Sequence, residues 1–476
     1  MEDKFRLGLP RIRLLSKEQC ELIHFSTLEV LRRTGVAVKE PSAIELFRKA
    51  GCFVEGEKVH IPAPLVEWAL RNTPKGVCLS DRNGHPALFL EDNNVYFGTG
   101  SDTPHVIDPF TGERRRTVLA DIANVSKIVD YLDEISFVMC SGIASDVDSD
   151  ISDIYHFEAM VIHTVKPIVF TAWNCANLKT IIHMAEIVAG GEDRLRNSPF
   201  LALYTEPISP LILPRESILK LMVMAEKSLP VVFAPSVTTG GTGPVTLAGG
   251  LVQGNAEILA GFVLANLVKE GAPLIYGGSG EPMDMSTTLM SYAAPESMMV
   301  VLAYTDMARY YKLPLFGYAG CSDSNIYDQQ ASLESALWIL ISALSGGNLV
   351  HDVGYINNGL TTSYEQLIVS NEVIGLARRI ARGFEVDEEN LALDLIHTVG
   401  PGGEYLTSRH TLNHFKENWF PDLISRKPYE KWEREGSKTL GRRANERVRF
   451  IIENHCPQPL EESIRKELKK SARSLD

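Results

Sequence analysis

The chain reads Pro273-Leu-Ile-Tyr-Gly277 and then Pro314-Leu-Phe-Gly-Tyr318, two short apolar runs that each stop at a glycine or a polar side chain. Six further runs have the same character: Val95–Thr99, Ser136–Cys140, Pro167–Thr171, Phe200–Tyr204, Val231–Pro235 and Asn348–Asp352. Their starts lie roughly 30 to 40 residues apart, the length of a strand–helix unit. Eight such units in succession predict an α/β fold, a closed (β/α)8 TIM barrel.

Segments with apolar residues at three- and four-residue spacing separate these runs, as expected for helices. They cover residues 119–133, 153–164, 177–189, 215–227, 248–269, 294–311, 330–345 and 364–382. Short strands that alternate with such helices specify a parallel β/α architecture. The count of eight closes the barrel, and one misassigned strand would open it into a doubly wound sheet.

The chain has 476 residues, whereas an unadorned barrel needs about 250. We therefore divide it into a helical N-terminal cap (1–91), the barrel (92–383) and a C-terminal helical extension (384–476). Ser16-Lys-Glu-Gln19 fits a capping box at the start of the first helix. The charged segment Pro457–Asp476 is expected to be a helix, either a peripheral arm or an oligomer contact.

Composition limits the function. The net charge of −13 argues against nucleic acid or an anionic membrane surface as a partner. Residues 1–6 contain acids and no apolar core of a signal peptide, and no stretch of about 18 residues is free of polar interruption. The seven cysteines are scattered without a C-x-x-C pair. These features predict a cytoplasmic protein without a structural zinc cluster.

The sequence lacks the residues that several common kinds of catalytic or binding site require. No lysine ends a predicted strand, since Lys166 precedes one, and no G-x-S-x-G elbow is present. The loop 238–244 is rich in glycine but lacks the Gly-Lys-Ser/Thr ending of a nucleotide loop, so it is either a phosphate cradle or a tight turn. His410 and His414 have metal-ligand spacing without the protease glutamate, which favours packing histidines.

Barrel chemistry sits where the strands end. The predicted strand ends bring together Thr99, Ser141, Trp173, Tyr204, Pro235, Tyr276, Gly320 and His351. Aromatic rings are frequent there: Phe97, Trp173, Tyr204, Tyr276, Tyr318 and Tyr355. Aromatic faces attract cations, above all quaternary ammonium groups. The alternative is that some of these rings simply fill the barrel.

Polar side chains also gather at this mouth. The loop 317–330 follows the seventh strand, Glu281 follows the sixth, and other strand ends add Ser101, Asp102, Glu206 and His351. Several carboxylates and one histidine at a barrel mouth indicate a site for a small polar or cationic ligand.

Four separate motifs resemble one known family. They are Tyr204-Thr-Glu-Pro-Ile-Ser-Pro-Leu211, the stretch 240–249 continuing to Asn255-Ala-Glu257, the loop Cys321-Ser-Asp-Ser-Asn325 with Gln330, and His410–Phe415 with Trp419. Together they are similar, in the same order, to the trimethylamine:corrinoid methyltransferases. The resemblance implies a β/α barrel that passes a methyl group to the Co(I) corrinoid (cobalamin) of a cognate partner protein, with no tightly bound cofactor in this chain.

The founding enzymes of that family carry pyrrolysine at a position near Asn325, where this chain has an ordinary residue. The chain therefore resembles the non-pyrrolysine branch, whose members demethylate quaternary amines such as glycine betaine, proline betaine and carnitine. A quaternary ammonium expels a neutral amine when its methyl group is displaced, so no general acid is required.

This resemblance assigns expected roles. A partial aromatic cage of Phe97, Trp173, Tyr204 and Tyr276 would hold the ammonium. His351, Ser322 and Asn325 would hold a substrate carboxylate, and Glu206, Asp102 or Asp323 would face the ammonium or orient these donors. We take His351, Asn325, Asp323 and Glu206 as catalytic candidates. The substrate-binding candidates are Phe97, Ser101, Asp102, Trp173, Tyr204, Tyr276, Gly320, Ser322 and Tyr355.

Two alternatives remain open: a zinc-assisted amine methyltransferase with Cys321 and His351 as ligands, and a non-catalytic cytoplasmic betaine-binding protein. A homo-oligomer is expected in each case.

Overall fold

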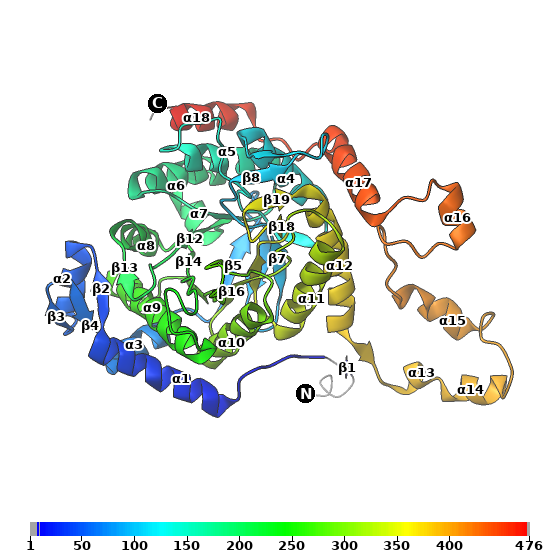
Figure 1. Cartoon of the computed structure of the whole chain (residues 1–476), viewed down its shortest axis with the longest axis horizontal. Coiled ribbons are helices and arrows are strands. Elements are labelled where there is room, and N and C mark those ends of the chain that lie inside the picture. The colour runs from blue at the N-terminus through cyan, green and yellow to red at the C-terminus, as the bar shows by residue number, and fades with distance from the viewer. Residues whose placement is uncertain (1–6, 9, 474–476) are drawn as a thin grey trace.

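The structure is a computed structural model that describes residues 7–8 and 10–473. The prediction for residues 1–6 and the end of the charged C-terminal segment, 474–476, lie outside the described residues. Eight parallel strands form the centre of the molecule (Figure 1). They are β7 (Tyr96–Gly98), β10 (Ile135–Phe137), β11 (Ile168–Phe170), β12 (Leu201–Thr205), β14 (Val231–Phe233), β15 (Leu274–Gly277), β16 (Leu315–Tyr318) and β17 (Leu349–His351).

The strands close into a barrel. Each pairs in parallel with the next along the chain, and β17 pairs with β7. A bridge between Val138 and Ile168 joins β10 to β11 and completes the ring. The predicted barrel is confirmed, and each strand overlaps its predicted run.

A ring of helices surrounds the barrel in Figure 1. Its main members are α4 (Leu119–Tyr131), α5 (Ser152–His163), α6 (Cys175–Ala189), α8 (Arg215–Lys227), α9 (Leu247–Val268), α10 (Pro295–Tyr311), α11 (Gln329–Ser345) and α12 (Tyr364–Arg382), with the short α7 (Glu192–Asn197) after α6. Helix α9 is long and apolar enough to cross a membrane by length and composition, but 78% of its most apolar window is buried in this fold. It packs against α1, α3 and α8 as a core helix.

Alternation of side chains along the strands separates two cores. One lies inside the barrel and includes Phe137, Val169, Val232, Ile275 and Phe316. The other lies between strands and helices. The hairpin of β5 (Val77–Ser80) and β6 (Pro86–Leu90) adds Val77, Leu79, Leu88 and Leu90 to the inner core. Its backbone bonds to residues just before β11 and β12, so it closes the N-terminal end of the barrel.

The N-terminal region is more mixed than the predicted helical cap. Helix α1 (Lys17–Glu29) has the expected capping box of Ser16 and Gln19, and continues as a π-helical turn, η2 (Val30–Thr34). Helices α2 (Pro41–Lys49) and α3 (Ala63–Asn72) follow. A small sheet joins β2 (Val36–Val38), β3 (Phe53–Glu55) and β4 (Lys58–His60) to β13 (Ile212–Leu213) of the barrel region.

After β20 (Phe384–Glu385), which pairs with β1 (Leu7–Gly8), the chain forms an arm that projects from the barrel (Figure 1). The arm carries α13 (Glu388–Leu391), α14 (Leu393–Val399), α15 (Arg409–His414), η3 (Phe415–Glu417) and α16 (Tyr429–Arg434). Helix α17 (Leu440–Asn454) then packs on α4 and α12. The charged helix α18 (Glu462–Arg473) packs on α5 and α6 of its own chain.

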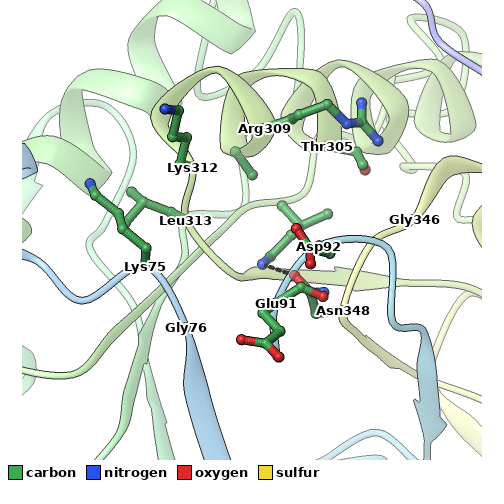
Figure 2. A pocket seen from close by; sticks show the side chains of 12 residues that line it. Lys75, Gly76, Glu91, Asp92, Thr305, Arg309, Lys312, Leu313, Gly346 and Asn348 are labelled. Atoms are coloured by element: carbon green, nitrogen blue, oxygen red, sulfur yellow. Dashed lines mark hydrogen bonds between the residues drawn. The ribbon is translucent and has the colours of Figure 1, made fainter. Parts of the chain in front are cut away.

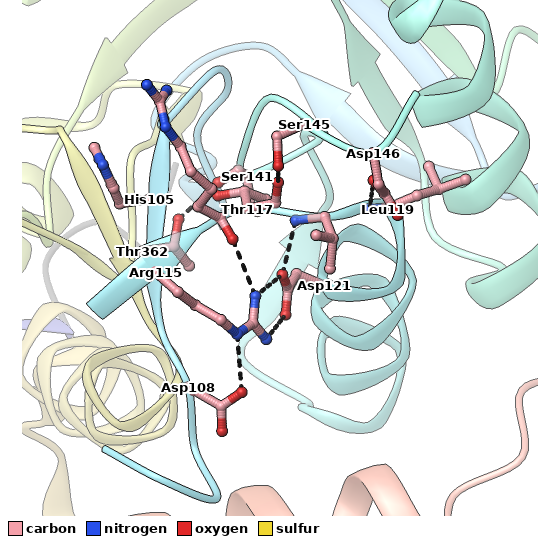
Figure 3. A network of polar contacts seen from close by, with 12 residues as sticks. His105, Asp108, Arg115, Thr117, Leu119, Asp121, Ser141, Ser145, Asp146 and Thr362 are labelled. Atoms are coloured by element: carbon pink, nitrogen blue, oxygen red, sulfur yellow. Dashed lines mark hydrogen bonds and ion pairs between the residues drawn. The ribbon is translucent and has the colours of Figure 1, made fainter. Parts of the chain in front are cut away.

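A four-stranded sheet roofs part of the C-terminal mouth. It joins β8 (His105–Ile107) and β9 (Arg114–Arg116), which follow β7, to β18 (Tyr355–Ile356) and β19 (Thr361–Ser363), which follow β17. Figure 3 shows how Arg115 fixes this sheet: its guanidinium binds Asp121 at 2.6 and 2.9 Å and Asp108 at 2.9 Å. The loops after the first and last barrel strands are thus held as one unit.

Candidate active site

A cavity of about 240 Å³ opens at the C-terminal end of the barrel. Five barrel strands or the loops after them line it, through Tyr204, Glu206, Ala234, Pro235, Ser236, Gly278, Ser279, Glu281, Tyr292, Phe316, Tyr318, His351 and Asp352. It is smaller than the usual site for a drug-sized ligand, so it suits a small molecule.

Aromatic rings form much of the wall. The His351 ring stacks on Phe316, with centroids 4.2 Å apart and planes 10° apart. Tyr204 lies 5.1 Å from Phe316, and Tyr318 lies 6.0 Å from His351. Tyr292 meets Tyr318 edge-on at 5.4 Å. This cluster can hold a cation by its ring faces.

Carboxylates form the rest of the polar surface. The Tyr318 hydroxyl donates to Glu281 Oε1 at 2.9 Å, and the Ser236 hydroxyl donates to Glu281 Oε2 at 3.1 Å. The Tyr204 hydroxyl donates to Glu206. His351 Nδ1 lies 2.7 Å from Asp352 Oδ1, a contact that fixes the plane of the imidazole ring.

These acids are poorly hydrated. Burial, together with the neighbouring charges of Asp102, Glu281 and Asp352, raises the pKa of Glu206 to about 8. Burial also raises the pKa of Glu281 and of Asp102, although hydrogen bonds to each partly offset the rise. A cation bound beside Glu206 would lower the pKa of that carboxyl group, because an opposite charge favours the ionised form.

The backbone is strained beside the cavity. Asp102 and Asp352 have φ angles of 69° and 70°, in the left-handed region that non-glycine residues seldom adopt. Gly100, two residues before Asp102, lies very close to Asp352 and Tyr355. A Cβ atom at Gly100 would be 2.1 Å from Asp352 Oδ1. The Tyr355 hydroxyl is buried and has no hydrogen-bond partner among the described residues.

The loop that carries Tyr292 is held from the neighbouring strand's loop. The Asp323 carboxylate accepts hydrogen bonds from the backbone amides of Tyr292 at 2.9 Å and Ala293 at 3.2 Å. It also accepts one from the Ser291 hydroxyl. Asp323 is thus placed to position an aromatic wall of the cavity without lining the cavity itself.

The structure brings three of the predicted site residues together in the cavity: Tyr204, Glu206 and His351. Asp102 and Tyr355 lie behind this wall, close enough for Asp102 to act on the pKa of Glu206. Ser101 hydrogen-bonds Asp102.

The predicted cage is corrected at two rings. Phe97 and Tyr276 are completely buried in the core between barrel and helices, not in the mouth. The Tyr276 hydroxyl donates to Asn255 of α9 at 2.8 Å. Both side chains lie at strand positions that point outward, because neighbouring residues alternate across the barrel wall.

A third ring also leaves the cage. Trp173 lies past the end of β11 and is 47% exposed. Its indole Nε1 donates to Ser152 at 3.0 Å, at the start of α5. It does not line the cavity.

The loop after β16 differs from expectation as well. Ser322 is buried and donates to Glu334 at 2.6 Å, and Asn325 is exposed. Gly320 sits at φ 77° beside Val353. None of these three residues lines the cavity. Of the residues predicted to donate hydrogen bonds to a substrate carboxylate, only His351 lies in the cavity wall.

Several wall residues were not among the catalytic or substrate-binding candidates, and four of them shape the site most: Glu281, which the sequence placed only at the mouth, and Tyr292, Phe316 and Asp352. Asp352 ends an apolar run and Glu281 lies four residues after another, which is a signal in the sequence. Phe316 lies two residues before Tyr318 and shares its inward face, a signal that needs the strand register. Nothing in the local sequence indicates Tyr292.

Two other candidate sites, a zinc site and a hollow at the opposite end of the barrel, have less structural support. The described residues contain no cluster of three or more His, Cys, Asp or Glu placed to hold a metal ion, so the zinc alternative lacks a third ligand of these types beside Cys321 and His351. A larger hollow of about 540 Å³ lies at the opposite end of the barrel (Figure 2). Its Lys75 and Arg309 already donate to backbone carbonyls of Leu70 and Ser345, at 2.7 and 2.6 Å.

A family model described as trimethylamine methyltransferase (MTTB) matches residues 3–474. The chain belongs to the trimethylamine methyltransferase family. A trimethylamine methyltransferase of Desulfitobacterium hafniense (strain DSM 10664 / DCB-2) is 34% identical over 94% of this chain and 91% of its own. A glycine betaine methyltransferase of Desulfitobacterium hafniense (strain Y51) is 31% identical over 96% of this chain and 95% of its own.

The fold agrees with a solved structure. The monomethylamine methyltransferase of Methanosarcina barkeri aligns over 100% of this chain and 94% of its own, with a TM-score of 0.51 and 13% identity. As a member of the trimethylamine methyltransferase family, the protein is a methyltransferase, and the predicted family is confirmed.

Proposed function

We propose that this methyltransferase moves a methyl group from a quaternary amine to the Co(I) corrinoid of a separate partner protein. The aromatic and acidic cavity at the barrel mouth carries the proposal. Rings such as Phe316 and His351 suit an ammonium that has no hydrogen to donate, and Glu206 and Glu281 supply carboxyl groups whose ionisation a bound cation favours.

The step balances without an acid or a base. The electron pair of Co(I) forms the new bond to the methyl carbon, the C–N bond pair returns to nitrogen, and cobalt is oxidised by two electrons. The amine leaves neutral. The protein's own residues then have to bind, orient the methyl group outward and exclude water.

The cavity walls fit that task. His351 is held by its stack on Phe316 and by Asp352, so it offers a rigid surface. The cavity accommodates a small amine and is too small for a corrinoid ring, which agrees with an acceptor presented by another protein at the mouth.

The glycine betaine methyltransferase among the relatives supports a quaternary substrate. The trimethylamine methyltransferase named above and the raised pKa of Glu206 favour a second candidate, a protonated tertiary amine such as trimethylammonium. A carboxylate can accept the N–H of that cation, and the leaving amine is again neutral.

Methyl transfer to free cob(I)alamin tests the proposal. We expect methylcobalamin to form with at least one of tetramethylammonium, choline, glycine betaine and carnitine. Product formation with trimethylamine alone would favour the second candidate. No methylcobalamin with any of these amines would contradict both.

A further inference from the structure

We propose that the cavity selects quaternary ammonium substrates that lack a carboxylate, and that glycine betaine is a poor ligand for this protein. This inference rests on the proposed function and narrows its substrate class. It follows from the charges and hydrogen-bond donors of the wall.

Among the described residues, the wall is rich in carboxyl groups and offers no lysine or arginine to a substrate anion. Glu206, Glu281 and Asp352 all line the cavity. No lysine or arginine lines it within residues 10–473. Lys220 acts on Glu206 from a distance, but it is buried outside the cavity and its ammonium donates to the Ala172 carbonyl.

Most hydroxyl donors of the wall are already used. Tyr204 donates to Glu206, and both Tyr318 and Ser236 donate to Glu281. Ser279 also hydrogen-bonds Glu281. These bonds present acceptor oxygens to the cavity, and acceptor oxygens repel a carboxylate.

The short distance between the ammonium and the carboxylate of glycine betaine brings that carboxylate close to the wall acids. In glycine betaine the carboxylate is separated from the nitrogen by a single CH₂ group. In a cavity of about 240 Å³ lined by Glu206, Glu281 and Asp352, we expect an ammonium held against Phe316 and His351 to place that carboxylate beside these acids. The substrate carboxylate repels every wall acid that is ionised, because few water molecules screen the charges, and it opposes the ionisation that the ammonium favours.

A neutral tail meets no such repulsion. Nδ1 of His351 faces Asp352, which leaves Nε2 for a ligand, and Tyr292 also lines the cavity. A hydroxyl tail can donate to the wall acceptors, and an amide tail can do the same through its NH₂ group. The wall therefore suits choline-like or tetraalkylammonium cations.

Isothermal titration calorimetry with matched ligands tests this selection. Glycine betaine and its primary amide, (carbamoylmethyl)trimethylammonium, have almost the same shape and differ in one negative charge. Choline and tetramethylammonium extend the series. We expect the amide and choline to bind at least tenfold more tightly than glycine betaine at pH 7.5, and the same order to hold for methyl transfer to cob(I)alamin.

The variant Glu281→Gln sharpens the test, because it removes one wall charge at constant volume. We expect it to reduce the preference for the amide over glycine betaine by about threefold or more. Glu296→Gln is the matched control, since Glu296 is exposed at the start of α10 and does not line the cavity. A thermal melt of each variant verifies folding.

The outcomes separate the two proposals. Glycine betaine that binds as tightly as its amide in the native protein overturns this inference and leaves the proposed function intact. Loss of binding and of methyl transfer with every quaternary ligand overturns both. A preference that is unchanged in Glu281→Gln contradicts the charge argument.

Discussion

The imidazole of His351 lies flat on the ring of Phe316, with 4.2 Å between centroids, while its Nδ1 faces Asp352 at 2.7 Å. A residue from the strand interior thus sets the orientation of a residue at the strand end. Two independent contacts fix the imidazole before any ligand arrives, which lowers the entropy cost of binding.

Replacement of Phe316 by Leu should weaken cation binding. The change removes a ring from the cavity wall and the stacked support of His351, so we expect a 3- to 10-fold higher Kd for choline or tetramethylammonium. Tyr276→Phe is the matched control, because it removes a hydroxyl that bonds Asn255 outside the barrel. We expect Tyr276→Phe to lower the free energy of unfolding by about 1 kcal/mol and to leave Kd unchanged. A large change in Kd for Tyr276→Phe would restore the predicted cage.

The protonation of Glu206 should make stability depend on pH. Its pKa rises from 4.5 to about 8 on folding, so the unfolded chain loses this proton at lower pH than the folded protein does. The contribution to stability is therefore complete below pH 4.5 and falls as pH rises towards 8, by about 1.4 kcal/mol per pH unit. Urea unfolding at pH 5, 6.5 and 8 should show that the free energy of unfolding of Glu206→Gln increases relative to that of the native protein as pH rises. Parallel curves for the two proteins would contradict the raised pKa.

Binding of a permanent cation should release protons. A quaternary ammonium carries none itself, yet its charge lowers the pKa of Glu206. Calorimetry at pH 7.5 in phosphate and in Tris should give binding enthalpies that differ with the ionisation enthalpy of the buffer. In Glu206→Gln this difference should shrink to near zero. Equal enthalpies in both buffers for the native protein would show that Glu206 is already ionised.

Loss of the Asp323 carboxylate should loosen the loop that carries Tyr292. Asp323→Ala removes the acceptor for the backbone amides of Tyr292 and Ala293. We expect faster hydrogen exchange across residues 284–293 and a several-fold higher KM, with a smaller effect on kcat, because the reacting atoms are untouched. Glu404→Gln in the projecting arm, where the carboxylate also caps a loop, is the control. Unchanged exchange in Asp323→Ala would remove its positioning role.

The Arg115 network should stabilise the roof sheet more than a surface pair does. Asp121 has a side-chain exposure of 6%, so Arg115→Ala leaves a buried carboxylate without its partner and should cost about 2 kcal/mol. Arg442→Ala breaks an exposed pair with Glu446 and should cost under about 0.5 kcal/mol. Denaturant unfolding of both variants measures the difference. Similar losses in the two variants would mean that the roof sheet is held by other contacts.

The barrel could be predicted because each strand is a compact apolar run, such as Pro314–Tyr318, followed by an amphipathic helix. The direction of individual side chains could not, because strands of three to five residues show too little alternation to reveal which face is inward. Tyr276 and Phe316 illustrate this limit: the strand-end ring points outward, and the ring in mid-strand points into the site. Tyr292 reaches the cavity through a long loop whose path depends on Asp323, 31 residues further along the chain.

The hairpin of β5 and β6 also has a kinetic meaning. Its apolar side chains fill the N-terminal end of the barrel, so ligands reach the cavity through the C-terminal mouth. Under the proposed function, we therefore expect the amine to bind first, the corrinoid protein then to cover the mouth, and the demethylated amine to leave after that protein dissociates.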